Sequence, residues 1–374
     1  MQKAKKYDWQ DSNLALFGSD TEKEVKKAAA ESEPAWKGCG QKTGVQIWRI
    51  VKFKVENWNK EEYGSFFEGD SYILLNTYQE KDSEELNYDL HFWIGMHSTQ
   101  DEYGTAAYKT VELDTYLDDK PVQHREVQGN ESDLFKSYFK SVVYMSGGAD
   151  SGFRHVKPEE YTPRLFHCHA EGKGRKARLE INEMKKMSRS SLKSDDVYIL
   201  DAGTKMFMWS GSGSRHDEKF KSAQEFQTMT AKRPRASKES LDENEISPDH
   251  EFWEYFTDDD VDGEADDDDE QEDDSNTFER VLYRLSNSSG ALDFTEVSKA
   301  SSICKSDLDS SDVFILDTGK ACYVWAGKDA DPEEKNNGIP YATEYLKKTN
   351  HMRAQITSLK EGQKCKQFSE IIGY

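Results

Sequence analysis

One short pattern occurs three times in the chain, and the interval between its copies constrains the fold. The strings GDSYILL, DDVYILD and SDVFILD begin at Gly69, Asp195 and Ser311. The aspartates of the later two copies, Asp196 and Asp312, lie 116 residues apart. That interval is too long for a solenoid repeat of roughly 20 to 50 residues, and it suits a small globular domain. We therefore expect the 374 residues to contain one domain three times.

A tryptophan and a glutamate accompany every copy. The glutamate follows the tryptophan by nine positions in each case: Trp93 and Glu102, Trp209 and Glu218, Trp325 and Glu334. Short runs rich in β-branched and aromatic residues precede the tryptophan, which is typical of strands, and a helical pattern follows the glutamate. Pro332 and the acidic residues beside it suit the first turn of a helix. The repeated unit is therefore predicted to be α+β.

The first copy predicts strands over 45–55, 70–78 and 90–96, and a helix over 101–117. One stripe of this helix is expected to face its own sheet: Tyr103, Ala106, Thr110, Leu113 and Leu117. A second, semi-apolar stripe lies on another side: Tyr108, Val111 and Thr115. A helix with two such stripes is either fully buried or binds a partner, and the pattern leaves both interpretations open.

An acidic segment separates the last two domains. From Asp258 to Asp274 the sequence contains no basic residue, and this run contributes much of the net charge of -22. Such a run cannot bury apolar surface and predicts an extended, self-repelling linker. The predicted division is an N-terminal arm over 1–44, a first domain over 45–158, a second domain over 159–257, an acidic linker over 258–276 and a third domain over 277–374.

The composition argues against several classes of protein. A net charge of -22 disfavours nucleic acid and anionic membranes as partners. Five cysteines without CxxC spacing argue against a disulfide framework or a zinc ribbon, so we expect reduced thiols. No stretch approaches about 18 apolar residues, and the first residues lack the apolar core of a signal peptide. We expect an intracellular protein without a transmembrane segment.

The repeated aspartate and glutamate predict a cation site. Carboxylates at a strand edge and a helix start are hard oxygen ligands, which suit calcium when backbone carbonyls and water complete the shell. Alternatively, the aspartate caps a turn and the glutamate caps the helix without a metal. Three copies at fixed spacing favour calcium over capping. Paired carboxylates also serve acid and base catalysis, but catalysis explains threefold repetition poorly and no GxSxG, P-loop or HExxH motif occurs, so no enzyme is expected.

Two histidines stand on a predicted strand of the second copy. His167 and His169 alternate along it and could reach one metal ion from the same face. Two histidines without a third ligand nearby are more often surface residues, and the sequence favours that interpretation.

Long strings of residues carry a resemblance to a known family, among them WKGCGQ, VQIWRI, VQHREVQG and GGADSGFRHVKPEEYTPRL. With these strings the chain resembles the gelsolin and villin family, most closely its three-domain severin and fragmin type. The resemblance implies three gelsolin-like repeats, each a central mixed β-sheet between one long and one short helix. It implies a calcium-dependent protein of the cytoplasm and actin cytoskeleton that severs actin filaments, caps their barbed ends and binds actin monomers. The alternative is a calcium-regulated capping or monomer-sequestering protein that does not sever.

The resemblance also implies calcium ligands. The site within each repeat would use Gly69 by its carbonyl, Asp70, Glu102 and the carbonyl of Ala149; Asp195 by its carbonyl, Asp196 and Glu218; and Ser311 by its carbonyl, Asp312 and Glu334. A second calcium, shared with an actin carboxylate, would use Asp114 and the carbonyls of Asp119 and Pro121. The family often has glycine where this chain has Asp119, so the turn could differ. The second repeat would take a further carboxylate from the acidic linker.

Surfaces for partners follow from the same resemblance. An apolar cleft of actin would receive the second stripe of the long helix together with its calcium ligand: Tyr108, Val111, Thr115 and Asp114. A basic patch would bind the side of the filament or phosphoinositides: Lys140, Arg164, Lys173, Arg175 and Lys176. The free protein is expected to be a monomer.

Overall fold

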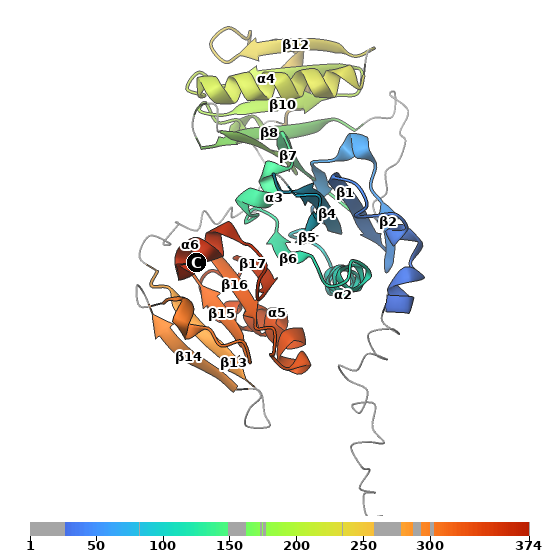
Figure 1. Ribbon diagram of the computed structural model, residues 1–374. Helices are drawn as coiled ribbons and strands as arrows, with labels where there is room; N and C mark the ends of the chain where they lie inside the picture. Colours follow the sequence, from blue (N-terminus) through green and yellow to red (C-terminus); the bar gives the residue numbers. More distant parts are fainter. Residues whose placement is uncertain are drawn as a thin grey trace, which may run out of the picture.

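The computed structural model describes residues 27–81, 83–148, 162–172, 174, 177–233, 235–257, 278–286, 293–299 and 303–373. Figure 1 shows three lobes, with the first repeat in blue and teal between the yellow-green second repeat and the orange-red third repeat. Most of the N-terminal arm and the whole acidic linker over 258–276 lie outside the described residues. The domain boundaries given above stay predictions.

The first repeat builds most of its sheet from antiparallel strands and closes it with one parallel strand. Its elements are β1 (Gly44–Val51), β2 (Lys54–Asn57), β3 (Ser65–Phe67), β4 (Ser71–Gln79), β5 (Leu86–Ile94), α2 (Gln100–Tyr116), β6 (Val122–Val127), α3 (Asp133–Ser137) and β7 (Ser141–Met145). Strand β6 pairs with β5 in parallel, whereas β4 pairs with β1 and β5 antiparallel. The prediction of one strand over 45–55 was wrong, because Lys52 and Phe53 adopt positive φ values and turn the chain into a β1–β2 hairpin.

The later repeats follow the same order. The second contains β8 (Arg164–Glu171), β9 (Arg178–Met184), β10 (Val197–Asp201), β11 (Lys205–Ser210), α4 (His216–Ala231), β12 (Ser237–Asp242) and the 3₁₀-helix η8 (Glu251–Tyr255). The third contains β13 (Val281–Ser286), β14 (Asp293–Lys299), β15 (Val313–Asp317), β16 (Ala321–Ala326), α5 (Pro332–Leu346), β17 (Gln355–Lys360) and α6 (Lys366–Ile372). Strand β12 pairs in parallel with β11, and β17 pairs in parallel with β16, as β6 does with β5. The predicted α+β fold with mixed sheets is confirmed.

The part of the sheet that belongs to each repeat lies between a long and a short helix, because its two faces carry separate apolar clusters. In the first repeat, α2 buries Ala106 and Leu113 with Trp48 and Phe92 on one face. On the other face, the short helix α3 packs its buried aromatic residue in a cluster with the repeated tryptophan. The same division recurs with α4 and η8 in the second repeat and with α5 and α6 in the third. The repeated tryptophan therefore faces the short helix every time.

The repeats are joined through their strands into larger sheets. Strand β17 of the third repeat pairs antiparallel with β6 of the first, with Thr357 opposite His124, and a ten-stranded sheet results. Strand β7 of the first repeat pairs in parallel with β9 of the second, and this sheet has seven strands. The first repeat is therefore held at two edges. None of the helices in the described part of the chain is both long and apolar enough to cross a bilayer.

Candidate functional site

The three copies of the pattern fold into the same tight loop. The glycine two residues after each repeated tryptophan donates its N–H to the carbonyl of the repeated aspartate, at 2.9 to 3.0 Å. A Cβ atom on this glycine would lie 2.2 Å from a backbone carbonyl, which no side chain can tolerate: Gly95 against Glu68, Gly211 against Ser194 and Gly327 against Ser310. Because glycine allows this close approach, the strand that follows the repeated aspartate begins close to the segment that leads into the long helix. The predicted carboxylate pair is positioned by this contact.

In the second repeat the structure brings the predicted carboxylates together. Ligand atoms of Asp196, Glu218 and His169 all lie within 4.8 Å of one another. Glu218 is only 1% exposed, and its Oε1 accepts a hydrogen bond from the N–H of Ala170 at 2.8 Å. Its Oε2 has no hydrogen-bond partner among the described residues, and burial raises the pKa of this carboxyl. A buried carboxylate oxygen without a partner is costly, and a bound cation would satisfy it.

The third repeat buries both predicted carboxylates, Asp312 and Glu334. Asp312 forms an ion pair with Arg284 of β13. The positive charge of Arg284 therefore balances the negative charge of the Asp312 carboxylate.

The first repeat differs at its glutamate. Asp70 is fully buried and ion-paired with Arg49, and a Cβ on Gly148 would lie 2.9 Å from its Oδ1. The chain just before Ala149 therefore passes the Asp70 carboxylate, while Ala149 itself lies outside the described residues. Glu102 turns back to Thr99, whose N–H and hydroxyl donate to its Oε2 at 3.1 and 3.0 Å. In this conformation Glu102 forms a capping box, the metal-free alternative.

The second predicted calcium site of the first repeat is a buried carboxylate beside a left-handed turn. Asp114 is 5% exposed, and its Oδ2 accepts a hydrogen bond from Gln123 at 2.9 Å. Its Oδ1 has no hydrogen-bond partner in the described part of the chain, and burial raises the pKa of this carboxyl to about 6. Asp119 has a φ of 57°, the region that glycine favours, so the turn keeps that conformation without glycine.

Two side chains of the third repeat contact all three predicted ligands of this second site. Lys360 Nζ lies 3.2 Å from Asp114 Oδ2 and donates to the carbonyl of Asp119 at 2.6 Å. Gln363 donates through Nε2 to the carbonyl of Pro121 at 3.2 Å. An ammonium group therefore lies among the oxygens predicted to hold a cation. Lys360 and Gln363 could not be identified from the sequence, because they lie more than 240 residues from their partners.

The two stripes of α2 separate as their patterns suggested. The core stripe is buried except for Tyr103, which was wrongly expected to be buried and is 36% exposed. In the second stripe Tyr108 is 66% and Val111 is 52% exposed, and Thr115 is half-buried. Of the two interpretations left open, a fully buried helix is excluded.

Comparisons with known proteins agree with this architecture. Residues 55–136, 179–248 and 294–368 match the family model described as the gelsolin repeat. The chain belongs to the gelsolin family. Gelsolin-like protein 2 of Lumbricus terrestris is 51% identical over 371 residues, which cover 99% of this chain and 98% of that protein. Severin of Echinococcus granulosus is 42% identical over 355 residues, which cover 92% of this chain and 91% of that protein. The resemblance to the three-repeat severin type is thereby confirmed.

The basic patch expected at the second gelsolin repeat is only partly described. Lys140 is exposed. Arg164 is engaged within the repeat, because Nε and Nη2 each donate to a carboxylate oxygen of Glu183 at 2.7 Å and its guanidinium lies over Phe166. The other three predicted members lie outside the described residues: Lys173, Arg175 and Lys176.

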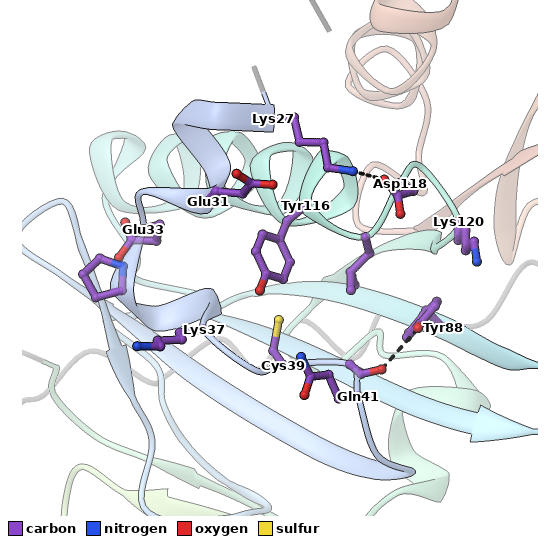
Figure 2. A pocket seen from close by; sticks show the side chains of 13 residues that line it. Lys27, Glu31, Glu33, Lys37, Cys39, Gln41, Tyr88, Tyr116, Asp118 and Lys120 are labelled. Carbon is purple, nitrogen blue, oxygen red and sulfur yellow. Dashed lines mark hydrogen bonds and ion pairs between the residues drawn. The ribbon is translucent and has the colours of Figure 1, made fainter. Parts of the chain in front are cut away.

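A hollow of about 620 Å³ lies between the N-terminal arm and the end of α2 in the first gelsolin repeat (Figure 2). Lys27 and Asp118 form an ion pair at its rim, and the Tyr88 hydroxyl donates to the carbonyl of Gly40. Acidic and basic side chains alternate around it, so its lining selects neither cations nor anions.

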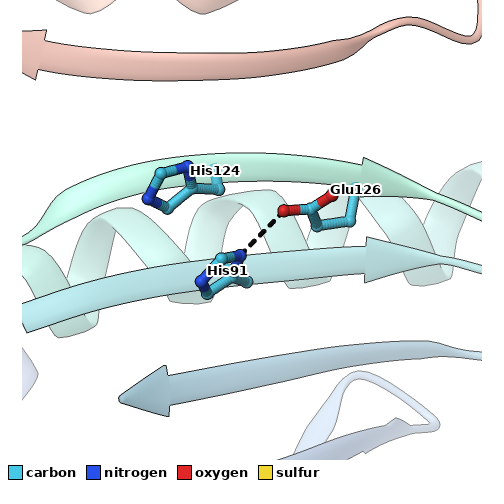
Figure 3. Close-up of side chains that lie close together, drawn as sticks. All are labelled: His91, His124 and Glu126. Atoms are coloured by element: carbon cyan, nitrogen blue, oxygen red, sulfur yellow. Dashed lines mark hydrogen bonds and ion pairs between the residues drawn. The ribbon is translucent and has the colours of Figure 1, made fainter. Parts of the chain in front are cut away.

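A buried cluster of two histidines and a glutamate lies in the same gelsolin repeat, and both oxygens of the glutamate have hydrogen-bond partners (Figure 3). His91 Nδ1 lies 2.8 Å from Glu126 Oε1, and the ring stacks on His124 at 4.3 Å. Both Glu126 oxygens also accept hydrogen bonds from Ser132, and His91 Nε2 contacts the Tyr138 hydroxyl. These contacts fasten α3 to the sheet and leave no carboxylate oxygen of the cluster for a metal.

Proposed function

We propose that this protein severs actin filaments and caps their barbed ends in response to calcium, and that it also binds actin monomers. The observation that carries the proposal is similarity to severin across nearly the whole length of both chains. A long helix with an exposed, semi-apolar stripe, led by Tyr108 and Val111, supplies a surface suited to an apolar cleft. The activity needs binding and mechanical displacement only, and no catalytic step is proposed.

The carboxylate pairs are the proposed calcium ligands, one site in each repeat. Calcium prefers several oxygen ligands at about 2.3 to 2.6 Å, including carboxylates and backbone carbonyls. The unpartnered Oε2 of Glu218 fits this requirement best, since a cation would compensate its burial. In the first and third repeats Arg49 and Arg284 would have to release their carboxylates, or share them with the ion.

We further propose that the arrangement in Figure 1 is a closed state of the protein. The third repeat pairs with the edge of β6 and places Lys360 among the oxygens of Asp114 and Asp119. Actin and a calcium ion shared with it cannot use those oxygens until the third repeat leaves. Calcium can favour the open state only by binding it more tightly than the closed state.

The expected result in an assay of filament length is a rise in filament number within seconds of adding protein and calcium. A calcium chelator should suppress the rise. Single-filament imaging separates the two candidate functions, because severing breaks filaments along their length, whereas capping or monomer sequestration only stops or reverses growth at the ends. If filaments stopped growing but never broke, the protein would cap filaments or sequester monomers without severing.

The number of calcium ions that each variant binds tests the proposed ligands. Each of the variants Glu102→Gln, Glu218→Gln and Glu334→Gln should lose one calorimetric binding event, because a neutral amide does not supply the carboxylate charge. Glu225→Gln is the matched control, since Glu225 lies on α4 with Glu218 but accepts from Ser141 outside the site. An unchanged number of events in all three variants would contradict the assignment.

Three finer points belong to the same proposal. The protein acts in the cytoplasm on the actin cytoskeleton and is a monomer when free. Lys140 and the basic residues at 173, 175 and 176 bind phosphoinositides or the filament side. Arg164 contributes to that surface only if it releases Glu183.

A further inference from the structure

The second repeat departs from the other two at one register position beside the metal site. The residue on the neighbouring strand opposite Tyr72 is Arg49, and the residue opposite Phe314 is Arg284. Both arginines are ion-paired with the repeated aspartate. The residue opposite Tyr198 is His167.

The imidazole of His167 occupies the place of those guanidinium groups. His167 Nε2 lies 3.1 Å from Asp196 Oδ2, and its ring stacks on Tyr198 at 5.0 Å. A guanidinium stays protonated and has no electron pair for a metal, whereas an imidazole can bind a metal or orient a ligand. At this register position the second repeat therefore has no fixed positive charge, whereas the other two hold a guanidinium against the repeated aspartate.

A second histidine follows two positions later on the same strand face. His169 Nδ1 lies 3.6 Å from Glu218 Oε1, and the corresponding positions of the other repeats hold Val51 and Ser286. His169, Asp196 and Glu218 form one of two clusters among the described residues with the spacing of metal ligands. An imidazole nitrogen thus joins the carboxylates in this repeat, at a position where the others have an aliphatic residue and a hydroxyl.

The cluster also contains an unsatisfied acceptor. Glu218 Oε2 is buried without a hydrogen-bond partner in the described residues, and the side chain is 2% exposed. The other cluster, around Glu126, has both carboxylate oxygens bonded. Of the two clusters, only that of the second repeat has a carboxylate oxygen without a hydrogen-bond partner.

We propose that this cluster binds Zn²⁺, with His169 Nδ1, Asp196 and Glu218 as protein ligands and water in the fourth position. Zinc takes nitrogen and oxygen donors at about 2.0 to 2.2 Å in a tetrahedron, whose neighbouring donors are about 3.3 to 3.6 Å apart. The 3.6 Å from His169 Nδ1 to Glu218 Oε1 fits that spacing, and the unpartnered Oε2 belongs to the same carboxylate. Half of the His169 side chain is exposed, so the ring has room to adjust.

The role of His167 in this site is to orient Asp196, as an outer partner holds a metal-binding carboxylate. Zinc and calcium compete for the second repeat alone, because the first and third repeats have no imidazole at these positions. The inference rests on the proposed function only in that both ions share Asp196 and Glu218.

Calorimetric titration of the full chain with zinc chloride in chelator-free buffer tests the inference. His169→Ser, which introduces the residue of the third repeat, should weaken zinc binding at least tenfold and change calcium binding less than twofold. Glu218→Gln should weaken the binding of both zinc and calcium at the second repeat. His97→Ser, at an exposed histidine of the first repeat, is the control and should change neither.

The outcomes separate this inference from the proposed function. Zinc binding of wild-type strength in His169→Ser overturns the inference, and so does the absence of zinc binding while three calcium events remain. If the unmodified chain bound neither zinc nor calcium, the calcium proposal would be overturned as well. Saturating calcium should lower the apparent zinc affinity, and zinc binding that is indifferent to calcium would place the zinc elsewhere.

Discussion

Replacing Tyr108 by aspartate is expected to lower the affinity for actin monomers about 100-fold. If Tyr108 enters an apolar cleft, the new carboxylate loses its water without gaining a partner, at a cost on the order of 3 kcal/mol. Tyr108 is 66% exposed in the free protein, so its loss removes little packing. Thermal stability should change by no more than about 0.5 kcal/mol, as for most surface substitutions. Monomer affinity and melting temperature are measured on the same preparation in calcium.

Met352→Asp is the matched control for this variant. Met352 is 52% exposed, as is Val111 of the stripe, but it belongs to the third repeat and is not part of the stripe. It should leave monomer affinity unchanged. An equal loss of affinity in both variants would indicate a general charge effect, and a large loss of stability in Tyr108→Asp would mean that the stripe packs within the protein.

The repetition in the sequence predicted the elements that carry the site. The helix expected over 101–117 is α2 at Gln100–Tyr116, and the α+β class is confirmed. The hairpin within 45–55 was missed because Lys52 and Phe53 form its turn with positive φ values. Neither residue is the glycine or asparagine that would have signalled a left-handed turn.

The joining of the repeats could not be predicted. Strand β6 pairs with β17 through residues more than 230 positions apart, and β7 pairs with β9 of the next repeat. Any exposed strand edge offers unpaired backbone groups, and the side-chain pattern does not identify which partner takes them. The sheet order therefore had to come from the structure.

The partners of the repeated aspartate were hidden for a related reason. Arg49 precedes Asp70 by 21 residues, but Arg284 precedes Asp312 by 28, so no fixed spacing links them in the sequence. Strand register aligns these arginines with His167 and makes the histidine exceptional. No third ligand stands near His167 and His169 in the sequence, whereas the fold brings Glu218 to 3.6 Å from His169.

Replacing Lys360 by methionine is expected to lower the calcium concentration for half-maximal severing by about three- to tenfold. In the closed state the ammonium lies 3.2 Å from Asp114 Oδ2 and donates to the carbonyl of Asp119. Methionine leaves the Asp114 carboxylate buried with only Gln123 as a partner, which destabilises the closed state. The open state loses nothing, so less calcium suffices. A tenfold change corresponds to about 1.4 kcal/mol, reasonable for a charged contact whose lysine is 41% exposed.

Lys364→Met distinguishes the cation position from a general weakening of the interface. Lys364 also joins the third repeat to the first, since its ammonium lies 2.8 Å from Glu80, but it is 78% exposed and pairs with Glu80 rather than with Asp114. A partner that exposed contributes little, so the calcium dependence of this variant should stay close to that of the unmodified chain. Equal shifts in both variants would mean that any lost contact loosens the closed state, and no shift in Lys360→Met would mean that the ammonium does not hold the third repeat over the site. A shift confined to Lys360 would identify it as the internal cation that calcium and actin must displace.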